Sequence, residues 1–251
     1  MSQPPVPTTI ISSTTDLQSL LSTIPALPTS PPSLYVSIVG NGSYYGQPGE
    51  PFGFLCLYIP PHNKIYLIDI QQLGEGVFTI TAPTNTAPTP DDESGNTTST
   101  SLKAILESPT IPKVFGSITS ECRALDWRFG VSVAGVHATF ILQWAASRYT
   151  CFNIGLSECV ARHAPAPVAN EYLYLHLREE AAYRAIKGSG DVPIKQRPLH
   201  EDIFLGLVNT LIPLPVLFQV YTDMLSAPDM KEYRDTVQSK TEDWIAEVLR
   251  R

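Results

Sequence analysis

Three short apolar runs, rich in strand-forming residues, lie close together in the first third of the chain. They cover residues 33–40, 52–59 and 64–70, and turn-forming Gly, Pro and Asn residues separate them. Runs of β-branched and aromatic residues of this length are typical of strands. Because consecutive strands joined by turns pair most simply with their neighbours, the pattern predicts a three-stranded antiparallel meander.

Helical spacing of apolar residues replaces the strand pattern farther along the chain. Helices are predicted over residues 16–24, 101–108, 121–130 and 138–149, and from about residue 228. Buried strands are predicted between them, over residues 112–118 and 131–136. Strands that alternate with helices predict an α/β fold, in which a mixed sheet carries helices on its faces.

The longest apolar stretch runs from Ile203 to Tyr221 and contains Pro213 and Pro215. Proline inside an apolar helix removes a backbone donor, so this stretch is predicted to be an interrupted core helix rather than a membrane anchor. Composition divides the chain into a disordered segment over residues 1–9, one domain over residues 10–225 and a C-terminal helix packed on it over residues 226–251. Within the domain, residues 81–101 are polar and predict a mobile loop.

Charge and cysteine content narrow the possible functions. The chain has 251 residues and a formal net charge of −7, which argues against a surface built throughout to bind phosphates. Its four cysteines form no metal-binding or disulfide pattern. The first residues lack the basic and apolar regions of a secretory signal, so the expected location is the cytoplasm or the nucleus.

Four segments, in this order and spacing, resemble the ribonuclease D-like 3′–5′ exonucleases, the tyrosine-bearing branch of the DEDD superfamily, and especially its small intracellular fungal members. They read LYVSIVGN, IYLIDIQQLGEGVF, SLKAILESPTIPKVFGSITSECRALDWRFGVSVAGV and RPLHEDIFLGLVNTLIPLPVLFQVY. The resemblance covers roughly Ser33 to Leu225. It implies a ribonuclease H-like fold, with a mixed central sheet made of the meander and parallel strands and flanked by helices.

The family's chemistry uses two divalent cations, which carboxylates from three chain segments hold. The resemblance places the four ligand positions at Ser37, Val39, Glu121 and Thr210, and the tyrosine that orients the attacking water at Gly206. Only Glu121 retains a carboxylate, and one carboxylate does not hold two hydrated cations. The resemblance therefore implies a degenerate exonuclease site, and no metal or other cofactor is expected.

A first hypothesis is a pseudo-nuclease that binds without cutting. Its partner would be single-stranded RNA or DNA, or a protein, including a second copy of this chain. Arg123, Trp127, Arg128 and Tyr149 are the candidate binding residues, because basic and aromatic side chains together suit single strands. The acidic total charge weakens the nucleic-acid version and leaves protein partners open.

A second hypothesis is an enzyme that uses the former cleft for metal-independent chemistry on a small molecule. Glu121, His137 and Cys122 are its candidate reactive groups, with Ser37 and Thr210 as polar neighbours. Fold alone does not choose between the hypotheses. A binding module predicts a groove with basic walls, whereas an enzyme predicts a closed, largely apolar pocket around the former ligand positions.

Overall fold

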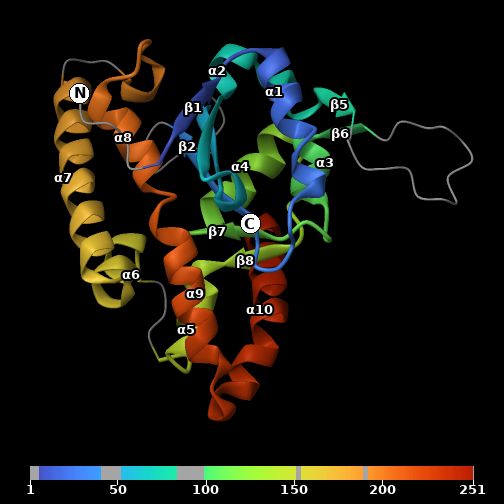
Figure 1. Ribbon diagram of the computed structural model, residues 1–251, viewed down its shortest axis with the longest axis vertical. Helices are drawn as coiled ribbons and strands as arrows, with labels where there is room; N and C mark the ends of the chain where they lie inside the picture. The colour runs from blue at the N-terminus through green and yellow to red at the C-terminus, as the bar shows by residue number, and fades with distance from the viewer. Residues whose placement is uncertain (1–5, 41–51, 84–98, 151–153, 189–191, 251) are drawn as a thin grey trace, which may run out of the picture.

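The computed structural model describes residues 6–40, 52–83, 99–150, 154–188 and 192–250. A six-stranded sheet with the order β1-β4-β3-β2-β7-β8 forms its centre (Figure 1). The strands are β1 (Thr8–Ile11), β2 (Leu34–Gly40), β3 (Phe52–Ile59), β4 (Lys64–Asp69), β7 (Lys113–Phe115) and β8 (Val136–Ala138). β3 is antiparallel to β2 and β4, while β1, β7 and β8 pair in parallel. The predicted meander and mixed sheet are confirmed.

Helices cover both faces of this sheet. They are α1 (Thr14–Leu21), α2 (Ile70–Leu73), α3 (Leu102–Glu107), α4 (Thr119–Phe129), α5 (Thr139–Ala146), α6 (Leu156–His163), α7 (Ala166–Gly188), α8 (Glu201–Asn209), α9 (Pro213–Ser226) and α10 (Lys231–Arg250). Short 3₁₀ turns occupy Ile24–Ala26, Pro60–His62, Glu75–Phe78, Pro193–Lys195 and Pro228–Met230. Figure 1 shows α7 and α8 on one side of the sheet and α1 and α3 on the other.

The alternation of side chains along β2 explains this two-sided arrangement. Val36 and Ile38 point into a core shared with α1, α3 and α4, whereas Tyr35 belongs to a second core shared with α8. β2 is therefore apolar on both faces, as expected for a strand with helices on each side. α10 packs against α4, α5 and β8. Trp244 fixes that contact by donating a hydrogen bond from Nε1 to Thr119 Oγ1 (3.0 Å).

Local signals locate several helix ends correctly. The Ser101 side chain accepts a hydrogen bond from the backbone N–H of Ala104 and caps α3. Gly130 ends α4 in the left-handed conformation (φ 59°). The strand predicted over residues 131–136 is wrong, because β8 begins only at Val136. The N–H groups of Val131 and Ala134 instead bond to the ends of the preceding helices, at Leu125 and Leu106, so they are not available to a strand.

Two predicted irregular segments need correction. Thr8 and Thr9, assigned above to a disordered segment, form β1 and pair with Ile65 and Tyr66, while residues 1–5 lie outside the described part of the chain. The predicted loop over residues 81–101 begins and ends in a small antiparallel ladder of β5 (Thr81–Pro83) and β6 (Ser99–Ser101). Residues 84–98, between these strands, lie outside the described residues. Both corrections concern pairing with a distant partner strand, which composition does not encode.

The apolar stretch around Ile203 to Tyr221 forms two helices, α8 and α9, as the interrupted-helix prediction requires. Glu201–Ser226 is long and apolar enough to cross a membrane, but 61% of its most apolar window is buried inside the fold. Core packing accounts for this burial. The 23-residue helix α7 was not predicted, since its sequence mixes polar and apolar residues on all sides.

Lys113 of β7 is fully buried and ties the sheet to the end of α3. Its Nζ donates hydrogen bonds to the carbonyl oxygens of Ile105 (2.8 Å) and Ser108 (2.7 Å). Burial lowers the pKa of Lys113 to about 8 from its ordinary value of 10.5. A neutral amine still has two N–H groups, which suffice for both carbonyl oxygens. The fold therefore tolerates loss of this proton better than the unfolded chain does.

This lowered pKa predicts how stability depends on pH. Between pH 8 and 10.5 the unfolded chain binds more protons than the folded protein, so the Lys113 contribution to stability rises with pH. We expect the unfolding free energy of the wild type, minus that of Lys113→Met, to increase by about 2 kcal/mol between pH 8 and about pH 10. Urea unfolding of both proteins at several pH values measures this difference. Parallel pH profiles would contradict it.

Candidate functional site

A cavity of about 320 Å³ opens where β2 and β7 end. Its walls come from β2, from the two residues that follow β7, from α4, α6, α7 and α9, and from the end of α8. Ser37, Val39, Glu121 and Thr210, the four positions that the resemblance assigns to metal ligands, all line it. Ser37 and Val39 are two residues apart on β2 and share one face of the strand. The structure thus brings together residues that lie up to 173 positions apart in the sequence.

The chemistry of these four positions does not fit a pair of divalent cations. Glu121, in the first turn of α4 and only 6% exposed, is the sole carboxylate among them. Val39 offers methyl groups, and the Thr210 hydroxyl donates a hydrogen bond to the carbonyl oxygen of Leu207 (2.8 Å). Across the described residues, no cluster of three His, Cys, Asp or Glu side chains could hold a metal ion.

Gly206, the position that the resemblance assigns to the tyrosine, lies against the side chain of a glutamate from another helix. A Cβ atom added to Gly206 would lie 2.2 Å from Cδ of Glu179, on α7. The Glu179 side chain lines the cavity instead. Burial raises the pKa of Glu179, and the nearby His176 opposes that shift, with Nδ1 3.8 Å from Glu179 Oε2. Sequence reasoning missed Glu179 and its neighbour Tyr183, because α7 carries no motif.

His137 and Cys122, two candidates for alternative chemistry, do not line the cavity. The His137 ring lies edge-on to Phe218 of α9, with centroids 5.6 Å apart, and burial lowers its pKa. Cys122 is 1% exposed in the core, where burial, and then the charges of Glu121 and Asp126, raise its pKa. A thiol in this environment stays protonated and is a poor nucleophile. Of the three candidates, only Glu121 faces the cavity.

The four candidate binding residues do not together form one free surface. The Arg123 guanidinium lies over the ring of Trp127, which is 54% exposed on α4. Arg128 is bonded to Glu75, with Nε 3.0 Å from Oε1. Tyr149 instead packs in an aromatic cluster with α10, where Tyr233 lies 5.2 Å away between ring centroids. The expectation of one basic, aromatic surface is therefore not met.

Three other arginines also form ion pairs with carboxylates. Arg148 pairs with Asp229, Arg162 with Glu158 and Arg197 with Asp69. Each pairing neutralises a charge that would otherwise attract phosphates. The cavity itself has no Lys or Arg among the described residues that line it. Its charged groups are the two glutamates, so it repels phosphate oxygens.

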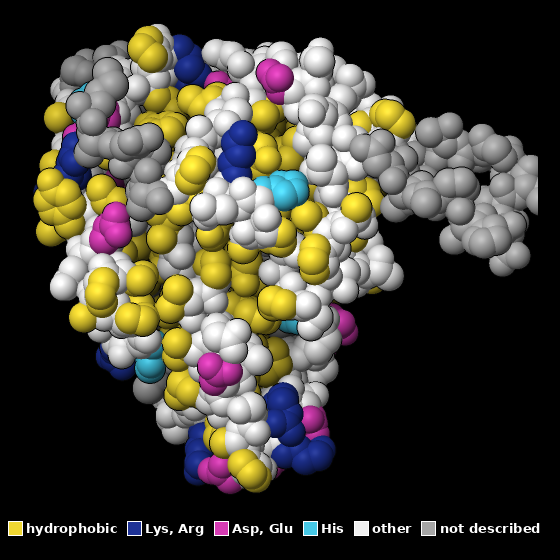
Figure 2. All heavy atoms as spheres, viewed as in Figure 1, with side chains coloured by type: hydrophobic (Ala, Val, Ile, Leu, Met, Phe, Trp, Pro, Cys, Tyr) yellow, Lys and Arg dark blue, Asp and Glu magenta, His cyan; other side chains and the backbone are white. Residues whose placement is uncertain are grey.

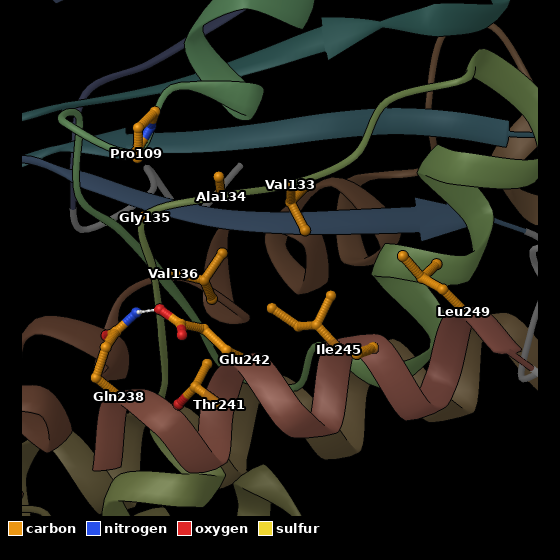
Figure 3. A pocket seen from close by; sticks show the side chains of 11 residues that line it. Pro109, Val133, Ala134, Gly135, Val136, Gln238, Thr241, Glu242, Ile245 and Leu249 are labelled. Carbon is orange, nitrogen blue, oxygen red and sulfur yellow. Dashed lines mark hydrogen bonds between the residues drawn. The ribbon is translucent and has the colours of Figure 1, made fainter. Parts of the chain in front are cut away.

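A second cavity, of about 460 Å³, lies between α10 and the segment before β8 (Figure 3). Figure 3 shows Val133, Ile245 and Leu249 around this space. Its polar side chains Gln238 and Glu242 bond to each other, with Nε2 2.8 Å from Oε1. The cavity has no lining residue in common with the cleft at β2. The Thr241 hydroxyl of its lining donates a hydrogen bond within α10, to the carbonyl oxygen of Val237 (2.9 Å).

The sheet order, the helices on both faces and the cleft at the ends of β2 and β7 define an exonuclease-type α/β fold. Solved structures agree: RNase D from Trypanosoma brucei in complex with GMP matches 97% of this chain and 64% of its own (TM-score 0.70, 14% identity). Escherichia coli RNase D matches 96% of this chain and 50% of its own (TM-score 0.59, 16% identity). Brucella melitensis NrnC with bound Mg²⁺ matches 88% of each chain (TM-score 0.52, 13% identity).

These neighbours are DEDD 3′–5′ exonuclease-fold proteins, and this chain has their ribonuclease H-like fold. The fold predicted from the sequence is confirmed. The chain spans about two thirds of the length of T. brucei RNase D. No family model and no curated protein matches the sequence. At identities of 16% or less, the likeness establishes the fold and leaves the activity to be argued from the site.

Proposed function

We propose that this chain is a catalytically degenerate 3′–5′ exonuclease-like protein, which acts as a binding module and does not cut nucleic acid. One observation carries the proposal: the cleft that corresponds to the family's metal site is lined by Ser37, Val39 and Thr210, and keeps only Glu121. Hard divalent cations require several charged oxygen ligands. Glu179 adds a carboxylate from α7, yet it stands where the family's tyrosine would lie and not at a ligand position.

Charge favours a protein over a nucleic acid as the partner of this module. Arg128, Arg148 and Arg162 are paired with carboxylates, and two glutamates line the cleft. T. brucei RNase D has been solved in complex with the RNA U12, which keeps RNA as the alternative partner. The net charge of −7 opposes non-specific RNA binding at physiological salt.

A small-molecule function is a second candidate, and the cavity is the observation that favours it. Its volume of about 320 Å³ lies at the lower end of the range for ligand pockets. Glu121 and Glu179 line it together, and Leu156 and Leu214 add apolar walls. Burial raises the pKa of Glu179, which is the direction that a general acid requires. If the protein converts a small molecule, loss of that conversion in Glu179→Gln would support this candidate.

Titration of Mg²⁺ and Mn²⁺ by calorimetry, paired with gel assays on labelled single-stranded RNA and DNA, tests the proposed function. We expect no heat of metal binding and no shortening of either strand, because three of the four ligand positions lack a carboxylate. A retarded but uncut band would show that the module binds nucleic acid. Metal-dependent trimming from the 3′ end would refute the proposal, and Glu121→Gln would then have to abolish it.

A further inference from the structure

Helix α7 carries two strongly exposed hydrophobic side chains at the margin of the molecule. Tyr174 is 60% exposed and Leu177 is 64% exposed, more than any other large hydrophobic side chain among the described residues. The inner side of α7 packs against α6, α8 and α9. Figures 1 and 2 show α7 at the left edge of the view, where hydrophobic side chains reach the surface.

The exposed residues form one continuous stripe along this helix. Asn170, Tyr174, Leu177, Ala181 and Arg184 are all exposed and follow one another at intervals of four and three residues. This is the spacing of the contact line between two paired helices. With 23 residues, α7 is roughly 34 Å long, so most of its length is available to a neighbouring helix.

The charged side chains at the two ends of this face differ in sign. Glu171 lies on the N-terminal side of Tyr174 and Leu177, whereas Arg184 lies on their C-terminal side. The Arg184 side chain is 75% exposed, and its ion pair with Glu180 joins neighbouring turns of the helix. Exposed pairs of this kind contribute little and can exchange partners. A face that is acidic at one end and basic at the other complements itself when two copies run in opposite directions.

We propose that two copies of this chain dimerise through α7, which pairs with its counterpart in antiparallel orientation about a two-fold axis close to Leu177. This axis brings the two Leu177 side chains together and places Tyr174 against the partner's Ala181, a large side chain against a small one. It also places Glu171 against the partner's Arg184, twice in the dimer. A parallel pair would set like charges side by side. Dimerisation through this face is independent of what the cleft binds.

The size of the face sets the strength of the dimer. Stable interfaces bury about 1,200–2,000 Å² in total, and one helix from each copy supplies an area near the lower limit. We therefore expect a reversible dimer with a dissociation constant in the micromolar range, measured by sedimentation equilibrium of the full chain. Leu177→Glu should raise this constant about tenfold or more, because it buries two like charges at the axis. Met224→Glu is the matched control, since Met224 is 40% exposed and belongs to a different helix, α9.

A charge exchange tests the antiparallel orientation. Glu171→Arg and Arg184→Glu should each weaken the dimer, and the double variant should restore it, because opposite charges then face each other again. Circular dichroism and thermal unfolding verify that these surface variants keep the fold. A wild type that stays monomeric, or a dimer indifferent to Leu177→Glu, overturns the proposed face. Failure of the double variant to recover overturns the antiparallel orientation.

Discussion

Replacing Asp69 with Ala is expected to lower the free energy of unfolding by about 3–5 kcal/mol. Asp69 is 1% exposed at the end of β4, and its Oδ2 lies 2.7 Å from Nε of Arg197. Its other oxygen accepts a hydrogen bond from the backbone N–H of Gln72 (3.1 Å) and caps α2. Removal of this carboxylate leaves the Arg197 guanidinium without its counter-charge and α2 without its cap, so both losses add.

The other contacts of the Arg197 guanidinium explain why the loss of unfolding free energy should be large. Arg197 lies 4.7 Å from the centroid of the Phe54 ring and donates hydrogen bonds to the carbonyl oxygens of Ile194 and Gln196. It thereby fixes the segment before α8 to β3 and β4. Urea unfolding measures the effect, and Asp229→Ala is the control, because the exposed Arg148–Asp229 pair should contribute less than about 1 kcal/mol. Equal losses in both variants would contradict this account.

Placing carboxylates at the positions that the resemblance assigns to metal ligands is expected to create metal binding, which we do not expect of the wild type. The variant combines Ser37→Asp, Val39→Glu and Thr210→Asp with the native Glu121, since all four positions line one cavity. Four carboxylates provide the charged oxygen ligands that Mg²⁺ and Mn²⁺ require. Calorimetry should detect binding, and Mn²⁺ should raise the melting temperature of the variant but not of the wild type.

Glu121→Gln in this triple variant is the matched control, and it should weaken metal binding by removing one ligand. Gly206→Tyr can be added only together with Glu179→Ala, because the Glu179 carboxylate occupies the space beside Gly206. The tyrosine should leave the affinity for Mn²⁺ nearly unchanged, since the resemblance gives it a role toward water rather than toward the metal. A folded triple variant that binds no metal would show that the cavity lacks the family's geometry.

The sequence by itself determined the elements that depend on local interactions. Apolar runs of strand-forming residues predicted β2, β3 and β4, and their order along the chain predicted the meander. Ser101 and Gly130 indicated helix ends, because a side-chain cap and a left-handed residue act within one turn. Resemblance located Ser37, Val39, Glu121 and Thr210, and it predicted that they share one cleft. The sequence alone shows that Ser37, Val39 and Thr210 carry no carboxylate.

Contacts between distant segments were decided only by the tertiary structure. Glu179 fills the space beside Gly206, and Arg197 binds Asp69 across 128 positions, although neither pair shares a local pattern. The same packing buries Cys122 away from the cleft, pairs Arg128 with Glu75 and leaves Tyr174 and Leu177 exposed. The physical reason is that burial and pairing depend on which surfaces meet when the helices close over the sheet. Periodicity and turn chemistry act over a few residues and do not contain that information.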